Sequence, residues 1–135
     1  MVGDMKKILS LLLTFCTASC LIAEEATTEV KHTTGKDAKA LLAAKDAKIL
    51  VIDVRTPEEY AEGHIAGARN IDFKGADFAE KLGAVDRKQT VLVHCARGGR
   101  STSSLEVFKK LGFKTVIHLD GGFTDWVKAG NPVEK

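Results

Sequence analysis

The residues best suited to chemistry are a cysteine and the loop that follows it. An apolar run ends at His94, and after it come Cys95, Ala96, Arg97, Gly98, Gly99, Arg100 and Ser101. In such a loop the backbone N–H groups, the two guanidinium groups and the N-terminus of a following helix all stabilise negative charge. A cysteine in these surroundings is favoured as the thiolate, the nucleophilic form of the side chain. The pattern therefore predicts nucleophilic sulfur chemistry on an anionic substrate.

The residues of this loop have separate expected roles. The predicted substrate-binding positions are Ala96, Arg97, Gly98, Gly99, Arg100 and Ser101. Their backbone N–H groups are expected to face the sulfur, and the two glycines allow the backbone angles of a tight turn. Arg97 is the residue expected to face the substrate, whereas Arg100 lies nearer the helix start and is expected to be more structural. Ser101 either hydrogen-bonds to the sulfur or caps the helix.

Other polar residues are expected to support the scaffold. Strand alternation sends His94 to the face opposite Cys95, and His64, in a turn-rich passage, is expected to hold that turn by hydrogen bonds. Asp53 and Arg55 alternate at the end of an apolar run and are expected to form an ion pair. The 4 histidines of the chain are not spaced as metal ligands with Cys95, so we expect no metal and no cofactor.

Hydrophobic patterning predicts strands that alternate with helices. Continuous branched apolar runs predict buried strands, and apolar positions at helical spacing predict helices. The expected strands cover residues 49–54, 91–94 and 115–119, with a short extended piece at 69–72. The expected helices cover residues 37–45, 77–82, 101–111 and 124–129, with a short helix that begins at Pro57. This alternation predicts an α/β domain with a parallel sheet covered on both faces and functional loops at the carboxyl ends of the strands.

Length and charge narrow the possible classes of protein. A chain of 135 residues forms one compact domain, so any active site lies within that domain. The 20 Lys and Arg residues and the 18 Asp and Glu residues are interspersed along the chain, without a basic stripe of the kind that binds nucleic acid. Nucleic acid is therefore not an expected partner.

Residues 1–23 are predicted to be a bacterial export signal. Two lysines precede an apolar run over residues 8–16, which is too short to span a bilayer, and small residues follow it. Cleavage after Ala23 would release a soluble periplasmic protein. The residues up to Cys20 also resemble a lipobox, and cleavage before Cys20 would leave a protein anchored in the cell envelope through that cysteine. Contact with a membrane is expected only in this second form.

The predicted mature protein has a short leader and one folded domain. Residues 24–34 are polar and lack periodicity, which predicts a flexible leader, and the domain is expected to cover residues 35–135. The soluble mature form would keep Cys95 as its one thiol, so no intramolecular disulfide is expected. A lone thiol in an exported protein favours a reactive role over a packing role.

Four separated motifs make the sequence resemble the rhodanese domain over residues 35–133. The motifs are residues 51–55, residues 59–60 together with 63–71, the loop after Cys95 and residues 121–126. The resemblance implies a central parallel sheet of about five strands with helices on both faces. It also implies a sulfurtransferase, in which Cys95 takes a sulfane sulfur from thiosulfate or a similar anionic donor as a persulfide and passes it to a thiophilic acceptor.

Other functions also use a cysteine at the start of such a loop. A persulfide carrier or relay module would use the same cysteine to deliver sulfur to a partner protein. Tyrosine phosphatases and arsenate reductases have a cysteine and an arginine separated by five residues, whereas 4 residues lie between Cys95 and Arg100 here, which favours a sulfane sulfur over a phosphate. Ala96 stands where many thiosulfate-preferring relatives carry a charged residue, so the identity of the donor stays open.

Overall fold

Within residues 27–135, the part of the chain that the computed structural model describes, five strands form one parallel sheet. In spatial order the strands are β1 (Glu29–Thr33), β5 (Thr115–Leu119), β4 (Thr90–His94), β2 (Ile49–Asp53) and β3 (Arg69–Asn70). The expected α/β class with a parallel sheet of five strands is confirmed. The predicted export signal over residues 1–23, including Cys20, lies outside the described residues.

The centre of the sheet forms where the sequence is most apolar. In β4, the residues Val91, Leu92 and Val93 are all 0% exposed, and this strand pairs with β2 on one side and β5 on the other. Branched apolar side chains pack well on both faces of a parallel sheet that helices cover. Cys95 follows directly after this central strand.

The first strand corrects the expectation of a flexible leader over residues 24–34 for the part from residue 27 onward, since residues 24–26 lie outside the described part of the chain. Glu29–Thr33 form β1, which pairs with β5 over all five residues, and the Glu29 N–H donates to the Lys114 carbonyl at 2.9 Å. An edge strand needs few apolar side chains, because its backbone hydrogen bonds to one neighbour hold it in place. The polar composition of this segment therefore does not indicate the strand, although the strand belongs to the folded domain.

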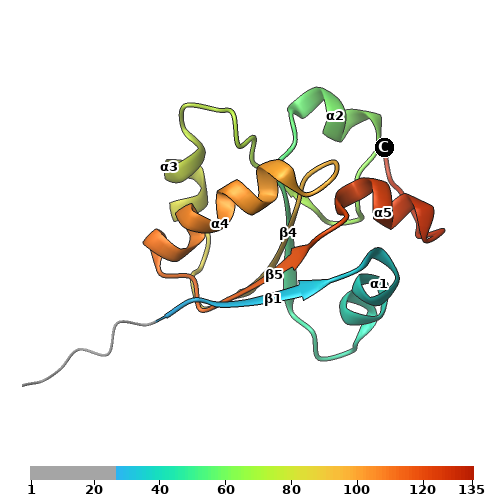
Figure 1. Ribbon diagram of the computed structural model, residues 1–135, viewed down its shortest axis with the longest axis horizontal. Coiled ribbons are helices and arrows are strands. Elements are labelled where there is room, and N and C mark those ends of the chain that lie inside the picture. The colour runs from blue at the N-terminus through green and yellow to red at the C-terminus, as the bar shows by residue number, and fades with distance from the viewer. Residues whose placement is uncertain (1–26) are drawn as a thin grey trace, which may run out of the picture.

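Helices cover both faces of the sheet. On one face, α3 (Phe78–Gly83) and α4 (Gly99–Leu111) pack their apolar side chains against β2 and β4. On the other face, α1 (Gly35–Ala43) and α5 (Gly122–Lys128) pack against the opposite side chains of the same sheet, and Tyr60 of α2 (Pro57–Glu62) joins them. Figure 1 shows α3 and α4 on one side of the strands and α1 and α5 on the other. Among the described residues, no helix has the length and apolar character needed to cross a membrane.

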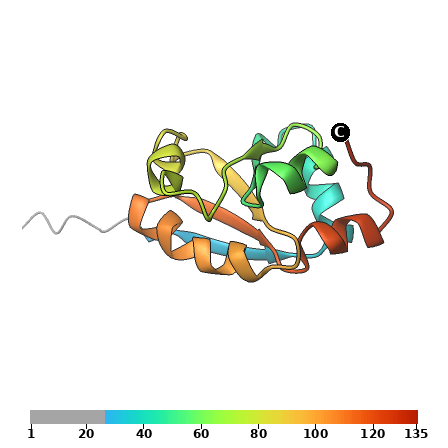
Figure 2. The same cartoon turned by 90° about the horizontal axis from the view of Figure 1, so that it is seen from above.

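The starts of α4 and α5 meet at the carboxyl edge of the sheet. The backbone N–H groups of Phe123 and Thr124 donate to the carbonyls of Cys95 and Ala96, at 2.8 Å and 3.0 Å. A Cβ on Gly122, which has φ +63°, would lie 2.6 Å from the Cys95 carbonyl oxygen, so the two segments are in close backbone contact. Figure 2 shows this meeting of the two helix starts at the end of the strands. The loop after β4 is thus fixed on one side by α5.

Candidate active site

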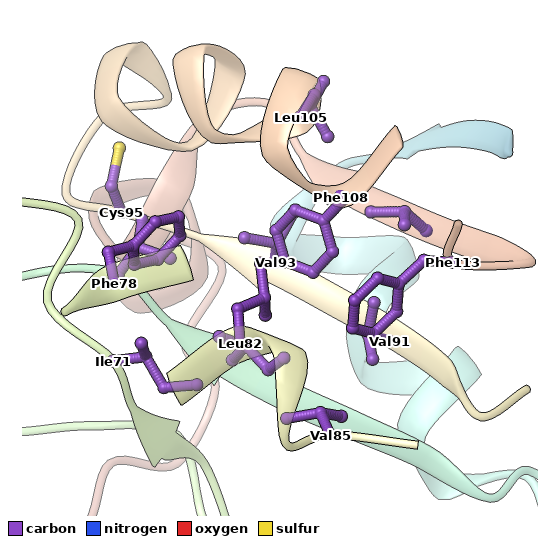
Figure 3. Close-up of a cluster of buried hydrophobic side chains, with 13 residues drawn as sticks. Ile71, Phe78, Leu82, Val85, Val91, Val93, Cys95, Leu105, Phe108 and Phe113 are labelled. Carbon is purple, nitrogen blue, oxygen red and sulfur yellow. The ribbon is translucent and has the colours of Figure 1, made fainter. Parts of the chain in front are cut away.

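Cys95 lies on the face of the sheet that α4 covers. Strand alternation puts it in one apolar cluster with Val91 and Val93, and Figure 3 shows its sulfur directed toward the first turn of α4. His94 points to the opposite face, as expected, where its ring lies 6.1 Å from that of Phe123. Cys95 is a free thiol and is 2% exposed. The sulfur is therefore held at the junction of a buried strand and a helix start.

The loop after Cys95 turns sharply at Gly98. This residue has φ +104°, precedes the first residue of α4, and donates its N–H to the Cys95 Sγ at 3.0 Å. A Cβ at this position would also overlap the carbonyl oxygen of Asp120, so both the angle and the space require glycine. Gly99 differs from the expectation, because its φ is not positive and nothing lies within 4 Å of a Cβ there. Only one of the two predicted glycines shapes the turn.

Ser101 lies in the first turn of α4 and contacts the sulfur. Its hydroxyl oxygen lies 3.4 Å from the Cys95 Sγ, 3.1 Å from the Gly98 carbonyl oxygen and 2.7 Å from the His118 Nε2. The helix cap is Gly98, so the alternative in which Ser101 caps the helix is not what the structure contains. Ser101 is 0% exposed, and its hydroxyl therefore finds its partners inside the protein.

The surroundings of Cys95 act on its pKa in opposite directions. Burial raises the pKa of the Cys95 thiol, whereas hydrogen bonds from the Ser101 hydroxyl and from backbone N–H groups of the loop lower it. The donating N–H groups belong to Ser101, Arg97 and Gly98. The net result is a pKa below the ordinary value of a thiol, which increases the fraction of nucleophilic thiolate at neutral pH.

The two arginines of the loop are placed differently. Arg100 donates from Nη1 and Nη2 to the two carboxylate oxygens of Glu59, at 2.8 Å and 2.9 Å, and so joins α4 to α2. This hydrogen bonding lowers the pKa of Glu59 to about 2. Arg97 is exposed and makes no ion pair with any other residue in the described part of the chain. The Arg97 guanidinium can therefore bind an anionic substrate, whereas the Arg100 guanidinium is already paired with Glu59.

A buried ion pair supports the loop from the neighbouring strand. Asp53 accepts hydrogen bonds from Arg55 at 2.7 Å to 3.1 Å, and Arg55 also donates to the Gly63 carbonyl at 2.7 Å. The Arg55 guanidinium lies 4.1 Å from the centre of the Phe123 ring. The expected Asp53–Arg55 pair is thus present, and it ties β2 to the α2 turn and to α5.

The two expected histidine roles in the scaffold agree with the structure. His64 Nδ1 hydrogen-bonds with the Tyr60 carbonyl at 3.0 Å and stacks on the Tyr60 ring, which holds the turn after α2. His94 is 0% exposed and its Nδ1 hydrogen-bonds with the Cys95 carbonyl at 3.0 Å. Burial lowers the pKa of His94, which keeps the ring neutral and makes it a brace for the loop backbone.

A hollow lies beside the cysteine loop. It has a volume of about 350 Å³, and its lining residues are Arg55, Glu59, Glu62, Gly63, Ala96, Phe123, Thr124 and Val133. A second hollow, of about 450 Å³, is lined by residues such as Lys48 and Thr90 at the amino ends of β2 and β4. The first hollow adjoins the residue that follows Cys95, whereas the second lies at the other end of the strands.

A polar cluster that the sequence patterns did not indicate lies beside the loop. His32 of β1, His118 of β5 and Asp120 bring three side-chain atoms that can bind a metal to within 4.8 Å of one another. Here they are joined by hydrogen bonds, because Asp120 Oδ1 lies 2.7 Å from the Nδ1 atoms of both rings. Alternation along β5 puts His118 on the face that α4 covers, but the position of β5 next to β4 could not be read from the chain. The expectation of no metal stays a prediction.

Comparisons with known proteins agree with this architecture. The family model described as Rhodanese-like domain matches residues 34–129. A thiosulfate sulfurtransferase, GlpE, from Pseudomonas aeruginosa is 42% identical over 77 residues, which cover 56% of this chain and 67% of the relative. A probable adenylyltransferase/sulfurtransferase, MoeZ, from Mycobacterium tuberculosis is 36% identical over 63% of this chain, but the match spans only 22% of that protein.

Solved structures show the same fold. The crystal structure of a rhodanese-related protein from Thermoplasma volcanium aligns with a TM-score of 0.66 and 30% identity. The alignment covers 77% of this chain and 97% of that one. The similarity therefore includes nearly the whole of that structure and most of this chain.

Proposed function

The chain belongs to the rhodanese-like domain family, and we propose that it moves a sulfane sulfur from thiosulfate or a similar donor to a thiophilic acceptor through a persulfide on Cys95. The observation that carries the proposal is the position of the Cys95 Sγ, 3.0 Å from the Gly98 nitrogen and 3.4 Å from the Ser101 hydroxyl. Sulfurtransferases among the relatives support the general class of reaction.

The proposed reaction has two displacement steps. The Cys95 thiolate attacks the outer sulfur of the donor, a new S–S bond forms, and the donor's own S–S bond breaks so that sulfite leaves with the bonding electron pair. The acceptor then attacks the outer sulfur of the Cys95 persulfide, and the cysteine leaves as the thiolate. One covalent intermediate thus divides a difficult transfer into two easier steps.

The loop supplies donors where negative charge is present in each step. The Gly98 N–H and the Ser101 hydroxyl contact the sulfur that is negative in the thiolate state. Such donors are fixed by the turn and the helix start, so they need no rearrangement during the reaction. The exposed Arg97 guanidinium supplies a charge that favours an anionic donor over a neutral one.

Steady-state turnover with thiosulfate and cyanide tests the proposal. We expect the full chain to form thiocyanate and the Cys95→Ser variant to form none, while Ser104→Ala, which removes a buried hydroxyl from the same helix, keeps the activity. Full activity of Cys95→Ser would overturn the mechanism. Persulfide formation with little turnover would favour the alternative, a carrier that passes sulfur to a partner protein.

We also propose that the protein acts in the cell envelope. The support is the pattern of two lysines, an apolar run and small residues within positions 1–23. Cell fractionation followed by intact mass measurement tests this proposal. A soluble periplasmic product is expected to begin at Glu24, a lipid-anchored product would begin at Cys20, and an uncut chain in the cytoplasm would contradict export.

A further inference from the structure

We propose that His118 is the proton acceptor for the Cys95 thiol, reached through the hydroxyl of Ser101 and held in the required orientation by Asp120. His118 and Asp120 are positioning residues in this proposal, because neither touches the reacting sulfur. The proposal rests on Cys95 as the nucleophile of the proposed function, and it adds how the resting thiol is ionised.

A continuous chain of side chains joins the sulfur to the molecular surface. Cys95 Sγ lies 3.4 Å from Ser101 Oγ, which lies 2.7 Å from His118 Nε2. The other ring nitrogen, Nδ1, lies 2.7 Å from Asp120 Oδ1. The first three side chains come from the end of β4, the first turn of α4 and β5, so three separate elements must pack together to build the chain.

The hydrogen bonds fix which nitrogen of His118 is free to accept a proton. Desolvation raises the pKa of Asp120, but the hydrogen bonds from His32 and His118 together outweigh it and leave the pKa lowered. This carboxylate is therefore ionised and acts only as an acceptor. His118 Nδ1 must therefore carry a hydrogen. In the neutral ring Nε2 then has a lone pair, and that lone pair faces the Ser101 hydroxyl.

The proton balance of the step is simple. The thiol proton of Cys95 moves to Ser101 Oγ as the hydroxyl proton of Ser101 moves to His118 Nε2. The products are a Cys95 thiolate, an unchanged serine and an imidazolium paired with the Asp120 carboxylate. In this state each contact has a donor, because Nδ1–H donates to Asp120, Nε2–H donates to Ser101, and the Ser101 hydroxyl donates to the thiolate.

Burial makes the serine bridge the direct route from the sulfur to the imidazole. The His118 side chain is 3% exposed and Ser101 is 0% exposed, whereas the Asp120 side chain is 56% exposed. The other groups around the His118 ring are His32 of β1, with ring centres 5.8 Å apart, and the Thr102 hydroxyl, 3.5 Å from Nε2. His94 of β4 is also within electrostatic range, and burial lowers its pKa, so it adds no positive charge that would oppose the imidazolium.

The pH dependence of Cys95 alkylation tests the proposal without any sulfur donor. The reaction of the full chain with iodoacetamide, in EDTA, is followed at the Cys95 peptide by mass spectrometry, because the full chain also contains Cys16 and Cys20. In His118→Gln the glutamine amide can hydrogen-bond to Ser101 but cannot accept the proton of the Cys95 thiol. We expect it to slow alkylation about tenfold at pH 6, a shift of one unit in the Cys95 pKa, with an unchanged rate at pH 10.

Matched variants separate the chain from general effects on the fold. Ser101→Ala is expected to raise the Cys95 pKa at least as much as His118→Gln, because it also removes the hydroxyl that hydrogen-bonds to the sulfur. The double variant is expected to shift no further than Ser101→Ala alone, because both substitutions break one path. Ser104→Ala and His32→Gln are expected to keep the profile of the unmodified protein. An unchanged profile in His118→Gln, or additive shifts in the double variant, would overturn the proposal.

A direct observation of the ring gives a second readout that does not depend on these variants. In the full chain the ¹⁵N chemical shifts of His118 are expected to show a hydrogen on both ring nitrogens while Cys95 is a thiolate, whereas in Cys95→Ser they are expected to show a hydrogen on Nδ1 alone. The same neutral ring in both proteins would contradict the proposed proton position. Because neither measurement needs thiosulfate, a failed sulfurtransferase assay and a failed proton path remain distinguishable.

Discussion

At the scale of single residues, the turn after Cys95 depends on one glycine. Gly98 has φ +104°, and its N–H donates a hydrogen bond to the Cys95 sulfur at 3.0 Å. Gly99 is the first residue of α4, and nothing lies within 4 Å of a Cβ there. The two adjacent glycines look alike in the sequence. Their backbone angles and surroundings make them different.

Substitution by alanine is expected to lower stability at Gly98 and to have almost no effect on stability at Gly99. Gly98→Ala forces a side chain into a left-handed angle and against the Asp120 carbonyl, which should cost about 1–3 kcal/mol of stability and raise the Cys95 pKa. Gly99→Ala should change stability by less than about 0.5 kcal/mol. Urea denaturation measures both, and equal losses in the two variants would contradict this assignment.

The separate roles of Arg97 and Arg100 give a second prediction at this scale. Arg97 is exposed beside the site, so Arg97→Ala should lower kcat/KM for thiosulfate about tenfold while leaving the melting temperature unchanged. Arg69→Ala removes an equal charge from β3 and serves as the control. If both variants lose the same activity, the effect is one of overall charge and not of substrate binding.

The residues closest to the chemistry could be predicted because their own neighbours in the chain identify them. Cys95 stands between an apolar strand and a loop with two arginines, and the pattern is local. His118 could not be found in this way, because its relation to Cys95 depends on two strands being adjacent in the sheet. The contacts of Cys95 with its loop are local in the chain, whereas the contact of His118 with the site is made by tertiary packing.

At the scale of elements, the structure departs most from the expectation at β1. The strands over residues 49–53, 90–94 and 115–119 could be predicted from their branched apolar runs, since burial on both faces requires such residues. The edge strand Glu29–Thr33 carries mostly exposed polar side chains and is held by backbone pairing with β5. The hydrogen bonds that stabilise this strand are made by the backbone, so the pattern of side chains does not indicate them.

A truncation series is expected to show that β1 belongs to the domain. A chain without residues 1–33 keeps Thr34, the N-cap of α1, and should be less stable than a chain without residues 1–26 by about 2 kcal/mol or more, because it loses the backbone hydrogen bonds between β1 and β5. Equilibrium denaturation in urea compares the two. Equal stability would mean that the strand pairing contributes nothing in solution.

The link between α2 and α4 predicts how stability depends on pH. The partly exposed Glu59–Arg100 pair lowers the Glu59 pKa to about 2, so its contribution is present above about pH 4.5 and is lost as the pH falls toward 2. Glu59→Gln should lower stability at pH 7 by about 1 kcal/mol or less and should reduce the acid sensitivity between pH 4.5 and 2. An unchanged acid profile would show that the pair is not maintained in solution.

At the scale of the whole molecule, the order of the strands creates the site. The order β1-β5-β4-β2-β3 places β4 between β5 and β2. His118 of β5 therefore lies on one side of the end of β4, and the Asp53–Arg55 pair at the end of β2 lies on the other. The parallel sheet and its two covered faces could be predicted from the alternation of elements. The order itself could not, because neighbours in a parallel sheet are not neighbours in the chain.

In the proposed mechanism the Cys95 sulfur carries a second sulfur atom during turnover. The most direct test of this step is the intact mass of the purified protein after treatment with thiosulfate, followed by peptide mapping. We expect an added mass of one sulfur atom on the Cys95 peptide, which is lost on treatment with a reductant and is not formed in Cys95→Ser. No adduct on Cys95, or an adduct that persists in Cys95→Ser, would contradict this mechanism.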